Sequence, residues 1–309
     1  MLNDLTGTTL TGNHNYARFN PMAGLTYKFS SAVSAYGGYA EASRAPTPAE
    51  LSCANPAQPC LLQNFLVSDP SLKQVVSKTW QAGFRGGFSP FGYGRLDWSA
   101  GVFRTENYDD ILNVTDPIIR TRGYFANEGD SLRQGVEASL KYRWEKLTFN
   151  ANYAYVDAIF LSYLTIPSPN NPFANAEGNI FVHPGDRIPT IPPHRLKASF
   201  DYNITDEWKV GADMVLASSQ YFFGDESNQN PKLPGYAVFN FRTSYEIEKG
   251  VTVYGLITNI FDRRYATYGA FYDTQILNVS GNPSTNLTNP AMITPAQPFS
   301  VSGGITVKF

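Results

Sequence analysis

The last eleven residues of the chain alternate strictly between two kinds of position. From Phe299 to Phe309 every odd-numbered residue is apolar or glycine, and every even-numbered residue is Ser, Gly, Thr or Lys. Successive side chains of a β-strand point to opposite faces of its sheet, so the pattern predicts a strand with one apolar and one polar face. The apolar face could meet a protein core in a soluble sandwich, or lipid in a membrane barrel whose polar face lines a wet lumen.

The same alternation recurs along the chain and predicts ten earlier strands. The clearest stretch runs from Gly135 to Trp144, where Val, Ala, Leu, Tyr and Trp on one face oppose Gly, Glu, Ser, Lys and Arg on the other. The facing of residues 32–40 is ambiguous, and a slip of the pattern near Phe103 suggests a β-bulge. The eleven predicted strands cover approximately residues 19–29, 32–40, 75–88, 95–108, 124–144, 147–155, 194–202, 208–220, 237–246, 251–261 and 299–309.

The connections between these strands alternate between short and long. The short ones are SPFGYG, Glu145–Lys146, NITDE and Glu248–Gly250, and the long ones cover residues 43–72, 109–122, 160–193, 221–235 and 262–298. Outer-membrane barrels have short periplasmic turns and long extracellular loops. Charges on the polar faces suit a water-filled interior, and aromatic residues near strand ends suit interfacial girdles. We therefore predict an all-β, antiparallel, up-and-down transmembrane β-barrel in preference to a soluble sandwich.

The predicted number of strands is odd, whereas bacterial up-and-down barrels close with an even number. In an antiparallel sheet of eleven strands the first and the last run in the same direction, so they cannot pair with each other as antiparallel neighbours. We therefore expect this chain to be part of a larger barrel, with the final strand left at an open edge.

The composition agrees with a sheet protein and limits the other classes. Hydrophobic residues make up 42% of the 309 residues, mean hydropathy is −0.27, and no run of 18 apolar residues predicts a membrane helix. The net charge of −2 provides no basic footprint, so nucleic acid is not an expected partner. The opening MLNDLTGTTL contains no secretory signal, and we expect an exported protein to have lost its front segment.

Two cysteines, Cys53 and Cys60, lie in the turn-rich segment CANPAQPC. In an oxidising compartment they could close a small loop, and we predict a disulfide between them. Two free thiols remain the alternative. A zinc site is disfavoured because no neighbouring Cys or His completes a ligand set.

Seven stretches resemble, in the same order, the C-terminal barrel half of TonB-dependent outer-membrane receptors, and among these receptors NIFDRRYATYG and GDESNQN look most like the siderophore receptors. One departure is Val76, where many members of the family have an acidic residue. The stretches are RFNPMAGLTYKF (18–29), EASRAPTPAEL (41–51), DPSLKQVVSKTWQAGFRG (69–86), ANEGDSLRQGVEASL (126–140), GDRIPTIPPHRLKASFDY (185–202), LPGYAVFNFRTSY (233–245) and NIFDRRYATYG (259–269).

This resemblance implies a 22-stranded barrel around an N-terminal plug, in the outer membrane of a Gram-negative bacterium. Residues 1–309 would then form a single barrel domain of about the last eleven strands, without the plug. The implied activity is uptake of a ferric siderophore or similar iron chelate, driven by the TonB–ExbB–ExbD system through the missing N-terminal region. The implied partners also include outer-membrane lipid and the barrel-assembly machinery, which recognises a terminal aromatic such as Phe309.

Two other functions remain open at this point. The first is a passive channel or porin, because a charged lumen without a plug would conduct ions and small solutes. The chain could also be a truncated barrel fragment with no transport activity of its own.

The polar residues of the loops provide no basis for an enzyme. His183 lies in HPGDR beside Asp186 and Arg187, but no local residues supply a nucleophile and an oxyanion hole. The loop acids Asp109, Asp110, Glu128 and Asp130 are too scattered for a calcium loop, so calcium is only weakly supported. We expect no catalytic residue, no cofactor and no resident metal.

Aromatic and basic residues of the long loops are the better ligand candidates. An anionic iron chelate needs cations for its charge and flat rings for packing. Each candidate could equally be a girdle aromatic or a solvated charge, and Arg263 and Arg264 fit a structural role at a strand end. The predicted ligand residues are His183, Arg187, Tyr221, Phe222, Tyr268, Phe271 and Tyr272.

Overall fold

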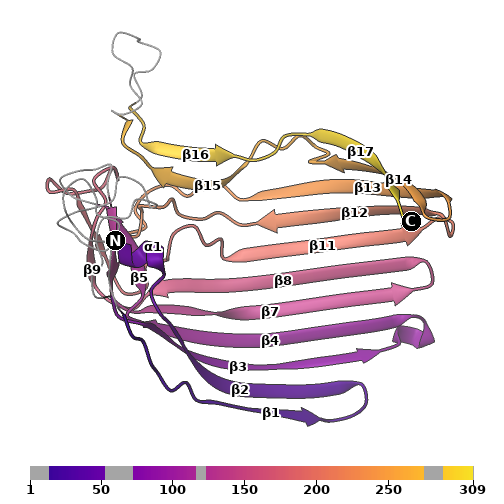
Figure 1. Ribbon diagram of the computed structural model, residues 1–309, viewed down its shortest axis with the longest axis horizontal. Helices are drawn as coiled ribbons and strands as arrows, with labels where there is room; N and C mark the ends of the chain where they lie inside the picture. Colours follow the sequence, from indigo (N-terminus) through magenta and orange to yellow (C-terminus); the bar gives the residue numbers. More distant parts are fainter. Residues whose placement is uncertain (1–13, 53–71, 116–122, 275–287, 309) are drawn as a thin grey trace, which may run out of the picture.

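The computed structural model describes residues 14–52, 72–115, 123–274 and 288–308. Eleven strands form one continuous sheet in which every neighbouring pair is antiparallel (Figure 1). In spatial order they are β1 (Met22–Lys28), β2 (Val33–Arg44), β3 (Val75–Phe88), β4 (Arg95–Tyr108), β7 (Ser131–Trp144), β8 (Leu147–Phe160), β11 (His194–Asn203), β12 (Trp208–Ala217), β13 (Tyr236–Glu248), β14 (Val251–Thr258) and β17 (Ser300–Val307). The predicted eleven-stranded antiparallel sheet is confirmed.

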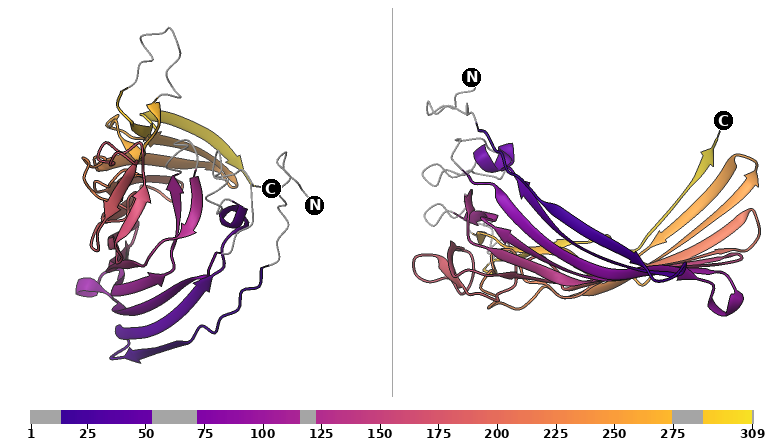
Figure 2. Two further views of the ribbon diagram at one scale, coloured as in Figure 1. Left: turned by 90° about the vertical axis from the view of Figure 1, so that its left-hand side faces the viewer. Right: turned by 90° about the horizontal axis from the view of Figure 1, so that it is seen from below.

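The sheet curves into an open trough and does not close (Figure 2). Strands β1 and β17 form its two edges, and they run in the same direction because ten antiparallel steps separate them. We call the end with the short connections the turn end and the opposite end the loop end. Within the described part of the chain, no helix is long and apolar enough to cross a membrane.

Three of the long connections contain small hairpins that the sequence pattern did not predict. The predicted strand over 124–144 is wrong in part, because the chain breaks at Gly129, where φ is +69°, and forms two strands, β6 and β7. The hairpins are β5 (Ile111–Thr115) with β6 (Gly123–Asn127), β9 (Leu164–Pro167) with β10 (Asn179–Val182), and β15 (Ala266–Phe271) with β16 (Ala291–Pro295). Two short helices, α1 (Pro48–Ser52) and η1 (Pro90–Gly92), lie in connections.

The suspected bulge near Phe103 is absent. The register of β4 runs without a break against both β3 and β7, so Phe103 stays on the polar face. Its partner on β7 is Gly135, where an added Cβ would lie 3.1 Å from the Phe103 ring. Gly135 leaves room for the Phe103 ring on the polar face. In the sequence pattern alone, this aromatic residue had suggested a change of face.

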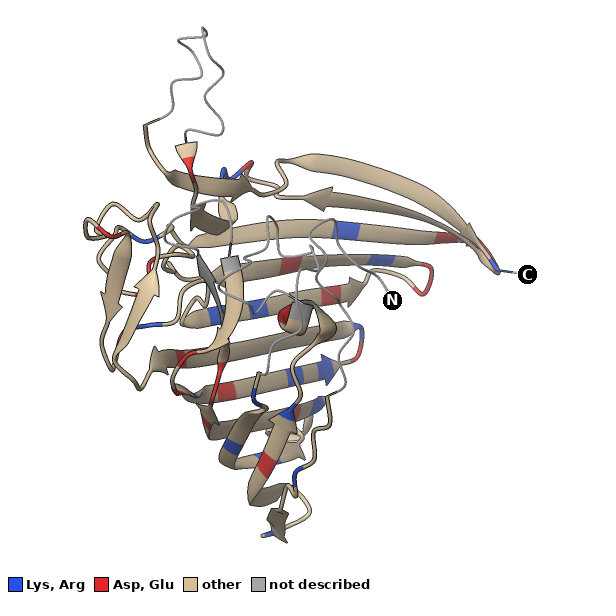
Figure 3. Cartoon of the chain, turned by 60° about the vertical axis from the view of Figure 1, so that its left-hand side comes forward, with Lys and Arg blue, Asp and Glu red and all other residues tan. Residues whose placement is uncertain are grey.

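The two faces of the sheet have opposite chemistry. The face opposite the charged positions, which is the convex one, exposes large apolar side chains such as Trp80, which is 61% exposed, together with Phe84, Val102, Phe200 and Phe239. A soluble protein rarely leaves so continuous an apolar surface in water, and lipid is the solvent that suits it. The concave face carries the charged and polar positions of the alternation (Figure 3).

One cluster of charges on the concave face is arranged around a glycine. The Arg242 guanidinium lies between two carboxylates, 2.6 Å from Asp201 and 2.8 Å from Asp213. Gly211 lies between Asp201 and Arg242 in the register, and a Cβ there would approach the Asp201 carboxylate to 2.5 Å. The glycine therefore makes room for an ion pair that spans three strands.

Candidate functional site

The described parts of four long connections gather at the loop end (Figure 1). We call them together the loop canopy, and they belong to residues 109–130, 161–193, 218–235 and 259–299. Among the described residues, most of the buried apolar side chains lie in the canopy or at the strand ends beneath it. The canopy is therefore a packed structure and a candidate site for recognition of a solute.

One small core joins the first two loops of the canopy. Alternation within β9 and β10 places Ile166, Ile180 and Val182 on one side of that hairpin, where they pack against Phe160 at the end of β8. Partly buried residues of the β5–β6 hairpin, including Leu112, complete the cluster. The two hairpins are held together by this shared apolar contact.

A second core joins the last two loops. The rings of Phe222 and Phe271 stack with centroids 5.5 Å apart, and Leu233 and Ala266 are buried beside them. Gly269 permits the close approach, because a Cβ there would lie 2.5 Å from the Phe222 ring.

A buried aspartate ties the loop over 161–193 to the loop over 218–235. Asp225 is 0% exposed, and its carboxylate accepts hydrogen bonds from the side-chain amides of Asn171 (3.3 Å) and Asn230 (2.8 Å). The backbone N–H groups of Gln229 and Asn230 donate to the same carboxylate. Four donors compensate the charge without a basic side chain, so Asp225 acts as a structural anchor between the loops.

The next residue, Glu226, is buried with far fewer partners. Its Oε1 accepts a hydrogen bond from the Gly224 N–H at 3.2 Å, whereas Oε2 has no hydrogen-bond partner among the described residues. Burial raises the pKa of the Glu226 carboxyl to about 7. Burial, and then the nearby Glu226, also raises the pKa of Tyr268.

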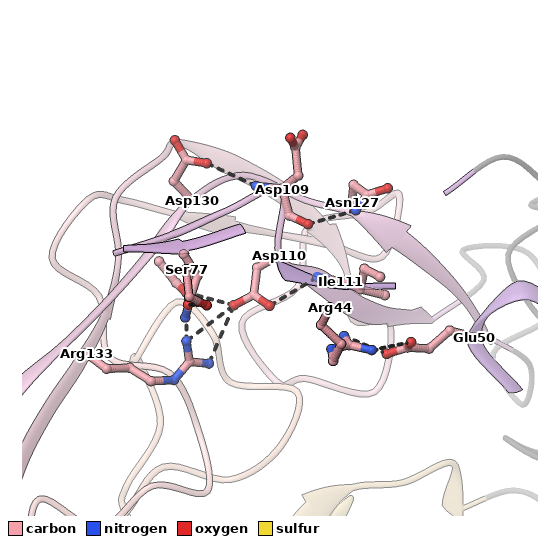
Figure 4. A network of polar contacts seen from close by, with 11 residues as sticks. Arg44, Glu50, Ser77, Asp109, Asp110, Ile111, Asn127, Asp130 and Arg133 are labelled. Atoms are coloured by element: carbon pink, nitrogen blue, oxygen red, sulfur yellow. Dashed lines mark hydrogen bonds and ion pairs between the residues drawn. The ribbon is translucent and has the colours of Figure 1, made fainter. Parts of the chain in front are cut away.

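Three of the four loop acids considered for calcium, Asp109, Asp110 and Asp130, lie in a network at the start of β5 and β7 (Figure 4). The Asp110 carboxylate accepts hydrogen bonds from Ser131 Oγ at 2.7 Å and from the Ile111 N–H at 3.1 Å, and Arg133 lies 3.5 Å from it. Lys73 forms an ion pair with Asp109 at 2.8 Å. Across the described ranges no group of three His, Cys, Asp or Glu residues could hold a metal ion. The network fastens a hairpin to the wall.

Four of the predicted ligand residues are engaged in contacts within the canopy or between the canopy and the wall. Phe222 and Phe271 belong to the second core, and Arg187 forms an ion pair with Asp157 at 3.0 Å. Lys232 lies over the Tyr221 ring, 4.6 Å from its centroid.

The other three predicted ligand residues keep exposed side chains. Tyr268 and Tyr272 are both partly exposed on or beside β15, and the His183 side chain is 62% exposed. The His183 ring meets the ring of Tyr163 edge-on at 5.7 Å, and Tyr163 is 78% exposed. The sequence analysis did not select Tyr163, because nothing in its segment distinguishes an exposed tyrosine ring from a buried one. Cys53, Cys60 and Phe309 lie outside the described residues.

Comparisons with known proteins show which family has this architecture. The family model for the TonB dependent receptor-like β-barrel matches residues 3–260. The chain is 25% identical over 270 residues to the probable TonB-dependent siderophore receptor PiuA of Acinetobacter baumannii, a match that covers 86% of this chain and 33% of that protein.

Solved structures give the same result for the fold. The crystal structure of PiuA superposes with a TM-score of 0.64 and 19% identity, over 93% of this chain and 35% of that one. The ferric yersiniabactin uptake receptor FyuA of Yersinia pestis superposes with a TM-score of 0.63 and 17% identity, over 93% of this chain and 37% of that one. The ferric-catecholate import receptor Fiu of E. coli K12 superposes with a TM-score of 0.61 and 18% identity, over 93% of this chain and 34% of that one.

The chain spans about a third of the length of these relatives. The family model covers well over half of the chain, and the eleven-stranded wall has the architecture of the solved receptors. The chain therefore belongs to the TonB-dependent receptor-like β-barrel family.

Proposed function

We propose that the chain forms part of the barrel of an outer-membrane receptor that takes up a ferric siderophore or a similar iron chelate. The observation that carries this proposal is the 25% identity over 270 residues to a probable siderophore receptor. The TonB–ExbB–ExbD system would supply the energy by acting on a region outside this chain. The wall and canopy described here would supply the pathway and part of the recognition surface.

The geometry of the canopy supports a role in recognition. At mid-height the concave face of β8 carries Asn150 and Asn152, whereas at the loop end it carries buried Ala158 and Phe160. The first canopy core packs on Phe160, so the loops cover the concave face. A solute that enters from the loop end would meet this canopy before the polar wall.

We propose that the exposed rings contact the ligand and that the packed ones position the loops. Tyr163, His183, Tyr268 and Tyr272 present rings to solvent, and flat rings suit an aromatic or conjugated chelator. Phe222, Phe271, Tyr221 and Arg187, held by the internal contacts described above, would act by holding the canopy in shape.

Transport by the complete gene product tests this proposal. Iron-starved cells with and without the gene would be offered ⁵⁵Fe as a catecholate, a hydroxamate and a citrate chelate, with and without a protonophore. We expect gene-dependent uptake of one chelate that stops when the proton gradient collapses. Uptake that survives the protonophore would favour a passive channel, and no gene-dependent uptake of any chelate would contradict the proposal.

A further inference from the structure

A pocket of about 310 Å³ lies where three canopy loops meet the loop end of β11 and β12. On the side of the wall it is lined by residues such as Arg195, Lys197 and Val215, and on the side of the canopy by residues such as Thr190 and Gln220. Its volume is at the small end of the range of small-ligand sites. The pocket therefore has room for a small solute or for one group of a larger one.

Hydrogen bonds between the canopy loops hold the upper side of this pocket in place. The Thr190 N–H donates to the Tyr221 carbonyl at 3.1 Å, which joins the loop over 161–193 to the loop over 218–235. The side-chain amide of Gln220, which is 8% exposed, donates to the Thr267 carbonyl at 2.9 Å and so adds the loop over 259–299. The lining is thus formed before any ligand arrives.

Two cations line the pocket without a counter-charge. Arg195 and Lys197 share the face of β11 that carries Asp201, so both point to the concave side of the sheet. Within the described residues neither of them forms an ion pair. The described residues that line the pocket include no Asp or Glu.

The surrounding strands do not supply the missing negative charge. Asp201 and Asp213, which lie nearer the turn end, are both engaged by Arg242. Glu137 is two strands from Arg195 in the register, about 10 Å, and does not line the pocket. The cross-strand neighbours of the two cations are all uncharged, and they are Ala154 and Ala217 for Arg195, and Asn152 and Val215 for Lys197.

The spacing of the two cations suits one compact anionic group. Arg195 and Lys197 are two residues apart on one face of one strand, which places their Cα atoms about 7 Å apart. Their long side chains can therefore converge on the same group, and a guanidinium pairs with a carboxylate through two parallel hydrogen bonds. A neutral solute in the same place would take water from both cations and return no charge, which is costly. The pocket thus discriminates by charge.

We propose that this pocket binds one compact oxyanionic group, such as a carboxylate, of the transported solute, and that Arg195 and Lys197 determine specificity for it. The inference rests on the proposed function for the source of that group. It narrows the iron chelate to one with net negative charge, of which ferric citrate and a ferric tris-catecholate are examples. A neutral ferric trihydroxamate is excluded.

Calorimetric titration of the complete gene product, purified in detergent, tests this inference. The probes are ferric citrate, a ferric tris-catecholate, a neutral ferric trihydroxamate and iron-free citrate. We expect one of the two anionic chelates to bind and the trihydroxamate to give no heat of binding. Iron-free citrate at millimolar concentration should compete with the bound chelate, because it offers the same carboxylates without the metal.

Substitution of the two cations tests their role directly. Arg195→Gln with Lys197→Gln should weaken binding of the anionic chelate at least about tenfold, because two charge-assisted hydrogen bonds are lost. Arg195→Lys with Lys197→Arg keeps both charges and should stay within about threefold. The matched control is Lys209→Gln, which lies on the same face of the sheet at the turn end and outside the pocket. Heat-modifiable gel mobility would show that each variant has folded.

The outcomes separate this inference from the proposed function. Binding and uptake of the neutral trihydroxamate alone would overturn the inference and leave the proposed function standing. Binding of citrate that depends on Arg195 and Lys197, with no iron chelate bound, would support the pocket and contradict the proposed function. The inference is also wrong if the double Gln variant keeps its affinity, if Lys209→Gln lowers affinity equally, or if no anion binds.

Discussion

The wall and the canopy use the same apolar residues in opposite ways. On the wall large apolar side chains point outward and stay exposed, while the concave face carries charges, among them Arg242 paired with Asp201 and Asp213. In the canopy two clusters of apolar side chains are buried, and most of the exposed positions are polar or aromatic. The wall is held by backbone pairing and needs lipid, whereas the canopy is held by side-chain packing as in a soluble protein.

The strongest test of this contrast removes one ring from each region. Phe160→Ala deletes a side chain that is 2% exposed and on which the first canopy core packs, at an expected cost of about 4 kcal/mol to the folding of the canopy. Limited proteolysis of residues 161–193 should accelerate strongly, while heat-modifiable gel mobility of the barrel persists. The control Phe200→Ala on the convex face should leave proteolysis unchanged. Equal sensitivity of both variants would show that the two regions are not stabilised differently.

A pH titration probes the polar part of the canopy. The folded pKa of Glu226 is raised from 4.5 to about 7, so protonated Glu226 favours the folded state. Stability should be greatest below pH 4.5 and decline as pH rises to about 7, by about 3 kcal/mol in all, because each pKa unit corresponds to about 1.4 kcal/mol. Hydrogen exchange of residues 218–235 between pH 4.5 and 8, compared at equal intrinsic exchange rates, would measure this decline.

The variant Glu226→Gln should flatten that pH profile, because its amide does not ionise. Tyr268 lies within the influence of Glu226, and its raised pKa should fall in the same variant. An unchanged slope would assign the pH dependence to another group.

A smaller effect is expected from crowding the ion pair of the wall. Gly211→Ala would place a Cβ 2.5 Å from the Asp201 carboxylate and 2.9 Å from Arg242, and should destabilise the barrel by about 2 kcal/mol. Gly255→Ala is the matched control, since its Cβ would meet only Thr243 at 3.6 Å. Urea midpoints of barrel unfolding in lipid vesicles would separate the two, and identical midpoints would argue against a tightly packed clamp.

The least effect on stability is expected from the exposed rings. Tyr163→Ala with His183→Ala should change unfolding free energies by less than about 0.5 kcal/mol, because both side chains are mostly exposed. If these rings contact the chelate, its half-saturating concentration for uptake should rise about tenfold. Tyr153→Ala, an exposed ring on the wall, serves as the control. Unaltered uptake in the double variant would remove this pair from the ligand site.

Sequence alone predicted the wall because its signal is long and regular. Strands such as β7 and β8 carry fourteen residues each with a period of two, and their apolar and polar faces were assigned correctly. The family match confirms the all-β fold, the family itself, the outer-membrane class of protein and the expectation that the chain is not an enzyme.

The canopy could not be predicted to the same degree. Strands β9 and β10 have four residues each, too few for a periodic pattern to stand out, and β9 ends in a proline. An aromatic side chain of a loop can be exposed to solvent or packed inside without any difference in the composition of its segment. Phe222 and Tyr268 therefore looked alike in the sequence. The segment GDESNQN reads as a solvated polar run, whereas the fold buries Asp225 and Glu226 within it.

The odd number of strands has a consequence for symmetry. Two copies of this sheet related by a twofold axis normal to the membrane would bring β17 of one copy beside β1 of the other, and these strands run in the same direction. Both seams of such a ring would be parallel in an otherwise antiparallel sheet. A rotationally symmetric pair is therefore a poor way to complete this wall, and an odd number of unlike strands completes it without a parallel seam.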